Sequence, residues 1–127
     1  MGYPMAKNVR QKMPAGAGFW IFDVNKDVCT RFAVEFQEYG PIYIAGSAKE
    51  VAQNAFSIAS IIPTGAHVRS VYLDPNTGIL AAKSNEMDKN RVYIECSTIE
   101  KEIAVDVASQ LQEAGMGQYV DCPVSVR

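Results

Sequence analysis

Apolar residues along the chain form short continuous runs, separated by longer stretches in which apolar positions recur every three or four residues. Runs of this length, bounded by glycine, proline or asparagine, are typical of strands within a sheet. The run Phe19–Asp23 lies between Gly18 and Asn25 and predicts a strand that is buried on both faces. Four further runs predict strands over residues 42–45, 56–62, 92–94 and 119–120.

The stretches between these runs have the spacing of amphipathic helices. In the last stretch, Ile99, Ile103, Val107 and Leu111 recur at every fourth position. The pairs Ser47–Glu50 and Ser97–Glu100 have the spacing of capping boxes and predict that helices begin there. Helices are predicted over residues 2–13, 25–39, 48–54, 64–73 and 98–114, with Lys7, Arg10 and Lys12 on the faces of the first helix away from its apolar positions.

The predicted elements therefore alternate strictly between helix and strand, beginning with a helix. Such an order, with short connections, predicts right-handed crossovers and a mostly parallel sheet. The fold class is α/β, doubly wound, and residues 1–127 form one domain because no linker or repeat divides the chain.

Composition narrows the classes of function. A net charge of −2 argues against nucleic acid as the main partner. No apolar run approaches the length of a membrane span, so no membrane partner is expected. Cys29, Cys96 and Cys122 lack the spacing of a zinc site and predict reduced thiols in an intracellular protein. His67 is the one histidine, which excludes any site that needs two histidines. No metal is expected.

Asp23 stands at the carboxyl end of the strand 19–23. In nucleotide-binding sheets, an acid at this place accepts hydrogen bonds from the ribose hydroxyls of adenosine. An aspartate before a helix is also a common helix cap. From this residue alone, the two interpretations are equally well supported.

Several motifs in order resemble the cofactor domain of the β-hydroxyacid dehydrogenases, the family that includes 3-hydroxyisobutyrate dehydrogenase and 6-phosphogluconate dehydrogenase. The resemblance spans nearly the whole chain, in Met1–Val9 (the end of a glycine motif), Ile62–Thr64, Glu95–Ile99 (the family has Asp-x-Ser-Thr-Ile) and Asp121–Ser125.

The resemblance implies a Rossmann-type domain that binds NAD, with NADP less favoured, and the following site residues. Gly2 would allow close packing of helix and strand, and Asp23 would bind the 2′-hydroxyl. Ile62 and Pro63 would line the cofactor with their backbone, while His67 stands where relatives have an asparagine that contacts it. Thr98 would contact the nicotinamide half, and Ser125 the substrate carboxylate. The alternatives are a surface role for His67 and a helix-cap role for Ser97 and Thr98.

Departures from the family pattern limit what the resemblance implies. The first strand with its two glycines, the helical second domain and the catalytic lysine have no counterpart in the chain. We therefore expect a fragment truncated at both ends, with no catalytic residue and no turnover of its own. The parent reaction would be hydride transfer between a small 3-hydroxy acid and NAD, in a homo-oligomer that is mitochondrial if it belongs to valine breakdown and cytoplasmic otherwise.

Three alternatives follow from these departures: a non-catalytic cofactor-binding or interaction module, a 6-phosphogluconate dehydrogenase-like NADP enzyme, and a truncated gene model. The missing first strand would normally lie between the second and fourth strands of the sheet. We therefore also expect a break in the sheet between the strands 19–23 and 56–62, and a chain that is partly molten or prone to aggregation.

Overall fold

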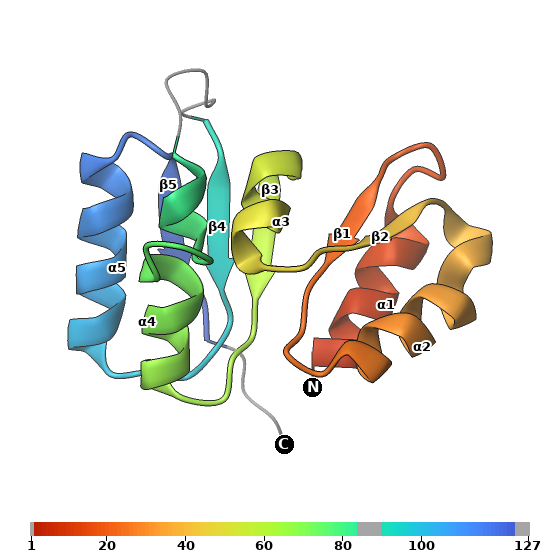
Figure 1. Cartoon of the computed structure of the whole chain (residues 1–127), viewed down its shortest axis with the longest axis horizontal. Helices are drawn as coiled ribbons and strands as arrows, with labels where there is room; N and C mark the ends of the chain where they lie inside the picture. The colour runs from red at the N-terminus through yellow and green to blue at the C-terminus, as the bar shows by residue number, and fades with distance from the viewer. Residues whose placement is uncertain (1, 84–89, 124–127) are drawn as a thin grey trace. The chain divides into compact units, whose positions relative to one another are not determined.

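The computed structural model describes residues 2–83 and 90–123, which fall into two compact units, residues 1–47 and 48–127 (Figure 1). Unit 1 contains α1 (Gly2–Lys12), β1 (Phe19–Ile21), α2 (Lys26–Phe36), a 3-10 turn (Gln37–Tyr39) and β2 (Ile42–Ile44). Unit 2 contains α3 (Ala48–Asn54), β3 (Ser57–Ser60), α4 (Gly65–Leu73), a 3-10 turn (Ile79–Ala82), β4 (Val92–Glu95), α5 (Lys101–Glu113) and β5 (Gln118–Asp121). The predicted order of helices and strands is confirmed.

In unit 1, β1 and β2 pair in parallel with Phe19 opposite Ile42, and an aromatic cluster joins this sheet to the helices. Phe19 stacks on Phe32 of α2 with 6.0 Å between ring centroids, and Tyr3 of α1 meets Phe32 edge-on at 5.2 Å. Burial of large aromatic side chains is the main stabilising contribution available to so small a unit.

Arg10 of α1 is fully buried, so the predicted placement of its side chain away from the core is wrong. Its guanidinium donates to the carbonyl oxygens of Ala17 at 2.7 Å, Pro14 at 2.8 Å and Pro41 at 3.4 Å, and it lies over the Phe19 ring. A buried cation is tolerated only where oxygens replace its water. Arg10 therefore holds together the loop that leads into β1 and the start of β2.

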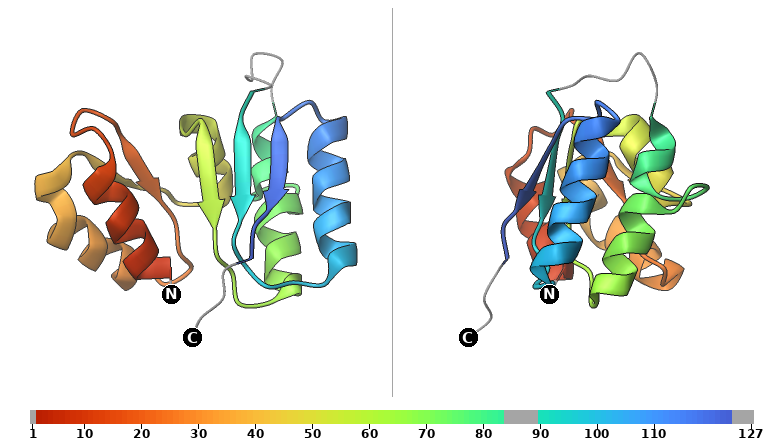
Figure 2. Two further views of the ribbon diagram at one scale, coloured as in Figure 1. Left: turned by 180° about the vertical axis from the view of Figure 1, so that it is seen from behind. Right: turned by 90° about the vertical axis from the view of Figure 1, so that its left-hand side faces the viewer.

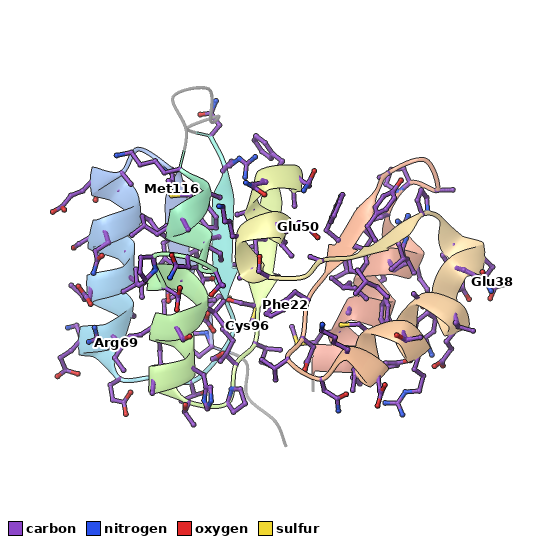
Figure 3. All side chains as sticks on the ribbon, in the orientation of Figure 1. Phe22, Glu38, Glu50, Arg69, Cys96 and Met116 are labelled. Carbon is purple, nitrogen blue, oxygen red and sulfur yellow. The ribbon has the colours of Figure 1, made fainter. Side chains whose placement is uncertain are left out.

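In unit 2, the three strands are parallel in the order β3-β4-β5, with Tyr93 opposite both Ile58 and Tyr119. The helices α3, α4 and α5 lie on one face of this sheet (Figure 2). The core between the two layers contains Tyr72, Tyr93 and Leu111, all fully buried. The Tyr93 hydroxyl donates to the carbonyl of Met116, labelled in Figure 3, at 3.0 Å.

The predicted break in the sheet is confirmed. Within the described residues, β1 and β3 belong to separate sheets, and each pairs with a single neighbour. The prediction that residues 19–23 are buried on both faces is wrong: the strand ends at Ile21 and its residues are only half-buried. Phe19 packs under the helices, whereas Trp20 stacks on Tyr43, which is itself 45% exposed.

Candidate functional site

The three strands of unit 2 end at one edge because they are parallel and in register. Ser60 lies opposite Glu95, and Glu95 lies opposite Asp121. The loops that leave this edge contain Ile62, Pro63 and Thr64 after β3, and Ser97 and Thr98 after β4. In doubly wound folds, ligands bind outside the carboxyl ends of the strands, so this edge is the candidate site.

Ser97 ties the first two loops together. Its buried hydroxyl oxygen accepts a hydrogen bond from the backbone N–H of Ile62. The predicted capping box Ser97–Glu100 is therefore wrong. Helix α5 begins at Lys101, its N-cap residue is Glu100, and no side chain caps it. The physical reason is that the N–H of Ile62, in the loop after the neighbouring strand β3, offers Ser97 a partner 35 residues earlier in the chain.

A buried polar network lies directly behind these loops, and sequence reasoning missed it. Glu95 is fully buried, and its carboxylate accepts from the Ser60 hydroxyl at 2.5 Å and from the Ser97 backbone N–H at 2.8 Å. Ser60 in turn bonds the Tyr72 hydroxyl at 2.6 Å. The only signals in the sequence were a serine inside an apolar run and an acid ending a strand.

Two tyrosines beside this network differ in their bonding. Burial raises the pKa of Tyr72, and the nearby Glu95 charge adds to the increase. Burial is also the main cause that raises the pKa of Tyr119, and the negative charge of Glu95 raises it further. Within the described residues, however, the buried Tyr119 hydroxyl has no hydrogen-bond partner. Both phenols therefore stay protonated in the folded chain across the neutral range.

The start of α4 presents Thr64 and His67 on the exposed side of the site. Thr64 is the N-cap residue, and its hydroxyl oxygen accepts from the backbone N–H of His67 at 3.3 Å. The same hydroxyl lies 2.6 Å from Nδ1 of His67. If the hydroxyl donates to Nδ1, the proton of the neutral imidazole is on Nε2, which is then a donor.

Gly65, the first residue of α4, packs closely against the start of α5. A methyl group at this position would overlap the side chains of Ile103 and Glu100. The close packing between the starts of α4 and α5 therefore requires a residue without a side chain at position 65.

Asp23 follows β1 in unit 1 and is exposed. Its Oδ1 accepts from the backbone N–H of Asn25 at 2.8 Å, which forms a local turn. Asn25, and not Asp23, is the N-cap of α2, since its side chain accepts from Asp27 N–H at 3.1 Å. The helix-cap interpretation of Asp23 is therefore wrong. A carboxylate has about four acceptor sites, so the turn leaves Asp23 able to bind a diol.

The other predicted residues are placed as follows. Gly2 is the first residue of α1. Since β1 runs back antiparallel to α1, the start of α1 and the carboxyl end of β1 lie at the same end of unit 1 (Figure 1). Thr98 is exposed, next to the buried Ser97. Ser125 lies outside the described residues.

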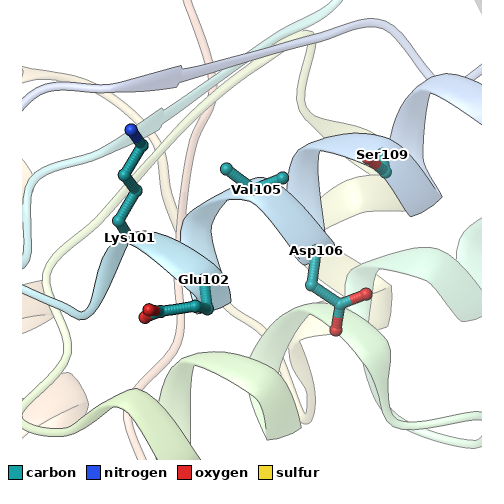
Figure 4. A pocket seen from close by; sticks show the side chains of 5 residues that line it. All are labelled: Lys101, Glu102, Val105, Asp106 and Ser109. Atoms are coloured by element: carbon teal, nitrogen blue, oxygen red, sulfur yellow. The ribbon is translucent and has the colours of Figure 1, made fainter.

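A shallow hollow on the outer face of α5 is distinct from this edge (Figure 4). A single helix forms it, and its Asp106 pairs with Arg69 at 2.5 Å. Residues 2–83 and 90–123 contain no group of three or more His, Cys, Asp or Glu able to hold a metal ion. Over the same ranges, no helix is long and apolar enough to cross a membrane.

Comparison with known proteins identifies several relatives of this chain. The mitochondrial 3-hydroxyisobutyrate dehydrogenase of Mus musculus is 34% identical over 98% of this chain and 33% of its own length. The NAD-dependent L-serine dehydrogenase of Pseudomonas aeruginosa is 31% identical, and this chain covers 37% of it. The chain thus spans about a third of the length of the curated relatives that it matches.

Among solved structures, the Mycobacterium tuberculosis 3-hydroxyisobutyrate dehydrogenase, determined with L-serine, superposes with a TM-score of 0.74 at 29% identity. The alignment covers 99% of this chain and 38% of that one. The family described as the NAD binding domain of 6-phosphogluconate dehydrogenase matches residues 1–126. The chain therefore belongs to this family of NAD-binding domains, and its relatives there include the 3-hydroxyisobutyrate dehydrogenases.

Proposed function

We propose that this chain binds NAD and forms the cofactor-binding part of a dehydrogenase that acts on small 3-hydroxy acids. The observation that carries the proposal is the Ser97–Ile62 hydrogen bond. It joins the loops that hold Thr64 and Thr98 at the carboxyl edge of the sheet. That edge is where doubly wound folds bind nucleotides.

The side chains at this edge suit the nicotinamide half of the cofactor. Thr64, His67 and Thr98 are exposed and offer hydroxyl and imidazole groups, which can donate to or accept from a carboxamide. The start of α4 adds the partial positive charge of a helix N-terminus, which favours phosphate oxygens. The donor set therefore fits a dinucleotide.

Each predicted residue has a proposed role in binding the cofactor or the substrate. The backbone at Ile62 and Pro63 would lie along the cofactor, and Thr98 would orient the nicotinamide ring. In unit 1, Gly2 would allow a close approach at the start of α1, and Asp23 would accept from the ribose hydroxyls. Ser125 would bind the substrate carboxylate.

The relatives' names support the substrate class. Both 3-hydroxyisobutyrate and L-serine carry a hydroxyl group on the carbon next but one to a carboxylate. NAD, when bound, would accept the hydride from that carbon. The residues of this chain would bind and orient the cofactor, and none of them matches the family's catalytic lysine.

Asp23 supports a preference for NAD over NADP. A carboxylate bonds the 2′-hydroxyl of NAD and repels the 2′-phosphate of NADP. No arginine follows β1; Val24, Asn25 and Lys26 stand there instead. Lys26 begins α2 and is exposed. We propose that Lys26 adds little to the binding of the 2′-phosphate of NADP. Its side chain faces solvent, and no hydrogen bond or ion pair within the described residues holds its ammonium group in place.

Calorimetric titration of the purified chain with NADH and NADPH tests the proposal. NADH should bind more tightly, and Asp23→Ala should narrow the difference. Asp27→Ala is the matched control, because this acid is also exposed but lies in the first turn of α2. Tighter binding of NADPH by the unaltered chain would overturn the preference, and binding of neither nucleotide would overturn the function.

A second candidate, which the same cofactor-binding residues would serve, is a module that binds NAD without turnover. Positioned proton transfer contributes about 10²–10⁴-fold to such reactions. Assays with 3-hydroxyisobutyrate and L-serine distinguish the candidates. NADH formed by the chain alone would exclude the non-catalytic module.

A further inference from the structure

Cys96 and Cys122 lie side by side at the carboxyl edge of the unit 2 sheet. Glu95 pairs with Asp121 in the parallel register of β4 and β5. The backbone N–H of Cys122 then donates to the carbonyl of Glu95 at 2.8 Å. In a parallel ladder, the N–H of a residue donates to the carbonyl of the residue just before its partner on the next strand. Since Cys122 donates to Glu95, its partner is the following residue, Cys96.

This arrangement suits a covalent bond between the two sulfurs. Paired residues of adjacent strands project to the same face of the sheet. Neighbouring strands lie about 4.8 Å apart, which is within the Cα range of about 4.4–6.8 Å found in disulfides. Closing the bond requires the two Cβ atoms to approach to about 3.8 Å. Cys122 directly follows the last residue of β5, so the ladder holds its backbone N–H but leaves its side chain free to approach Cys96.

The two thiols are in different surroundings. Cys96, labelled in Figure 3, is 6% exposed, whereas Cys122 is exposed. Burial raises the pKa of Cys96, and the nearby Cys122 and Glu95 charges raise it further. A soluble oxidant therefore meets Cys122 first. Cys29, the third cysteine, is buried in unit 1.

We propose that Cys96 and Cys122 are a modification site, at which hydrogen peroxide forms an intramolecular disulfide. The Cys122 thiolate attacks one peroxide oxygen, the O–O bond breaks, and a sulfenic acid and water result after protonation. The Cys96 thiolate then attacks Sγ of Cys122, the S–O bond breaks, and a second water leaves. Two thiols lose two electrons, and one peroxide is reduced to two waters.

The disulfide also affects the cofactor site, a consequence that rests on the proposed function. Cys96 directly precedes Ser97, whose hydroxyl holds the loop after β3. Drawing Cys96 toward β5 shifts Ser97 and Thr98 relative to Ile62. The oxidised chain therefore binds NADH more weakly than the reduced chain, and a thiol reductant restores binding.

Peptide mapping of the 127-residue chain tests the bond independently of nucleotide binding. Trypsin separates the cysteines, since Cys96 falls in residues 92–101, Cys122 in 102–127 and Cys29 in 27–31. The folded chain is treated with hydrogen peroxide, alkylated and digested. We expect two of the three thiols to be lost, with peptides 92–101 and 102–127 linked in a monomeric chain.

Variants separate this bond from general oxidation. Cys29→Ser should leave the cross-link intact, whereas Cys122→Ser should leave Cys96 alkylatable after the same treatment. In urea the selectivity should disappear, because it depends on the register of β4 and β5. The proposal is overturned if Cys96 stays a free thiol in the oxidised chain while Cys122 forms a sulfinic acid or links two chains. It is also overturned if all three thiols survive.

Discussion

The hydroxyl of Ser97 accepts the backbone N–H of Ile62, so one side chain joins the loops that follow β3 and β4. Residues on either side of this bond are those proposed to hold the nicotinamide half of the cofactor. The bond is partly buried, and water does not readily replace it. Both the stability of unit 2 and the geometry of the site should depend on it.

Ser97→Ala should lower the free energy of unfolding by about 1–3 kcal/mol, because it leaves a sheltered N–H without an acceptor. NADH affinity should fall as well. Urea denaturation followed by circular dichroism measures the first effect. Ser109→Ala, on the exposed side of α5, is the control and should change stability by less than about 0.5 kcal/mol. Equal effects of the two substitutions would show that the hydrogen bond contributes nothing.

Removing the hydroxyl group from Tyr72 and from Tyr119 should have opposite effects. Tyr72→Phe deprives Ser60 of a partner and should cost about 1 kcal/mol. Tyr119→Phe removes a buried hydroxyl that is unpaired within the described residues, so it should be neutral or stabilising. Thermal melts of the two variants at pH 7 provide the comparison. A larger decrease in melting temperature for Tyr119→Phe than for Tyr72→Phe would contradict the conclusion that, within the described residues, Tyr72 is hydrogen-bonded and Tyr119 is not.

The unaltered chain should lose stability as the pH rises above the ordinary tyrosine pKa of 10.0. Burial raises the pKa of Tyr72 in the folded state, so above that pH only the unfolded chain releases the proton. The stabilisation is complete below the unfolded pKa and is lost as the pH rises toward the folded pKa. Urea midpoints at pH 8 and pH 11 should differ less for Tyr72→Phe than for the unaltered chain. An unchanged difference would contradict the prediction.

Arg10→Lys should destabilise unit 1 although it keeps the charge. A lysine ammonium cannot span the carbonyls of Pro14, Ala17 and Pro41 as the planar guanidinium does. The expected loss is about 1.5–3 kcal/mol, typical of hydrogen bonds to a charged group. Trp20, the single tryptophan, lies in unit 1 and reports its unfolding by fluorescence.

Arg31→Lys is the control for this prediction. Arg31 is exposed and lies over the Tyr3 ring at 5.4 Å, a contact that lysine can also make. Its substitution should change the midpoint of the fluorescence transition little. If the two variants unfold together, the buried guanidinium is not what holds the start of β1.

The order of helices and strands was predictable because each element has its own apolar period. What the sequence could not reveal were contacts between residues far apart in the chain. The capping-box pattern at Ser97 is local, whereas its actual partner Ile62 is in the loop after β3, 35 residues earlier. Arg10 had a position away from the apolar face of α1, and its burial depends on carbonyls of the loop after α1 and on the carbonyl of Pro41, 31 residues further along the chain. The Glu95 network likewise forms only when β3, β4 and α4 come together.

The chain of hydrogen bonds from Tyr72 through Ser60 to Glu95 also constrains which substitutions can be accepted at these positions during evolution. Glu95 has no exposure to solvent, so each donor it has must come from the protein. A substitution at Ser60 alone would leave a buried carboxylate without one of its donors, and a substitution at Glu95 alone would leave the Ser60 hydroxyl bonded to Tyr72 but not to a carboxylate. Replacing Ser60 and Glu95 together with apolar residues of similar shape would avoid the under-bonded buried carboxylate. Positions 60 and 95 should therefore vary as a pair among related sequences, with position 72 following them.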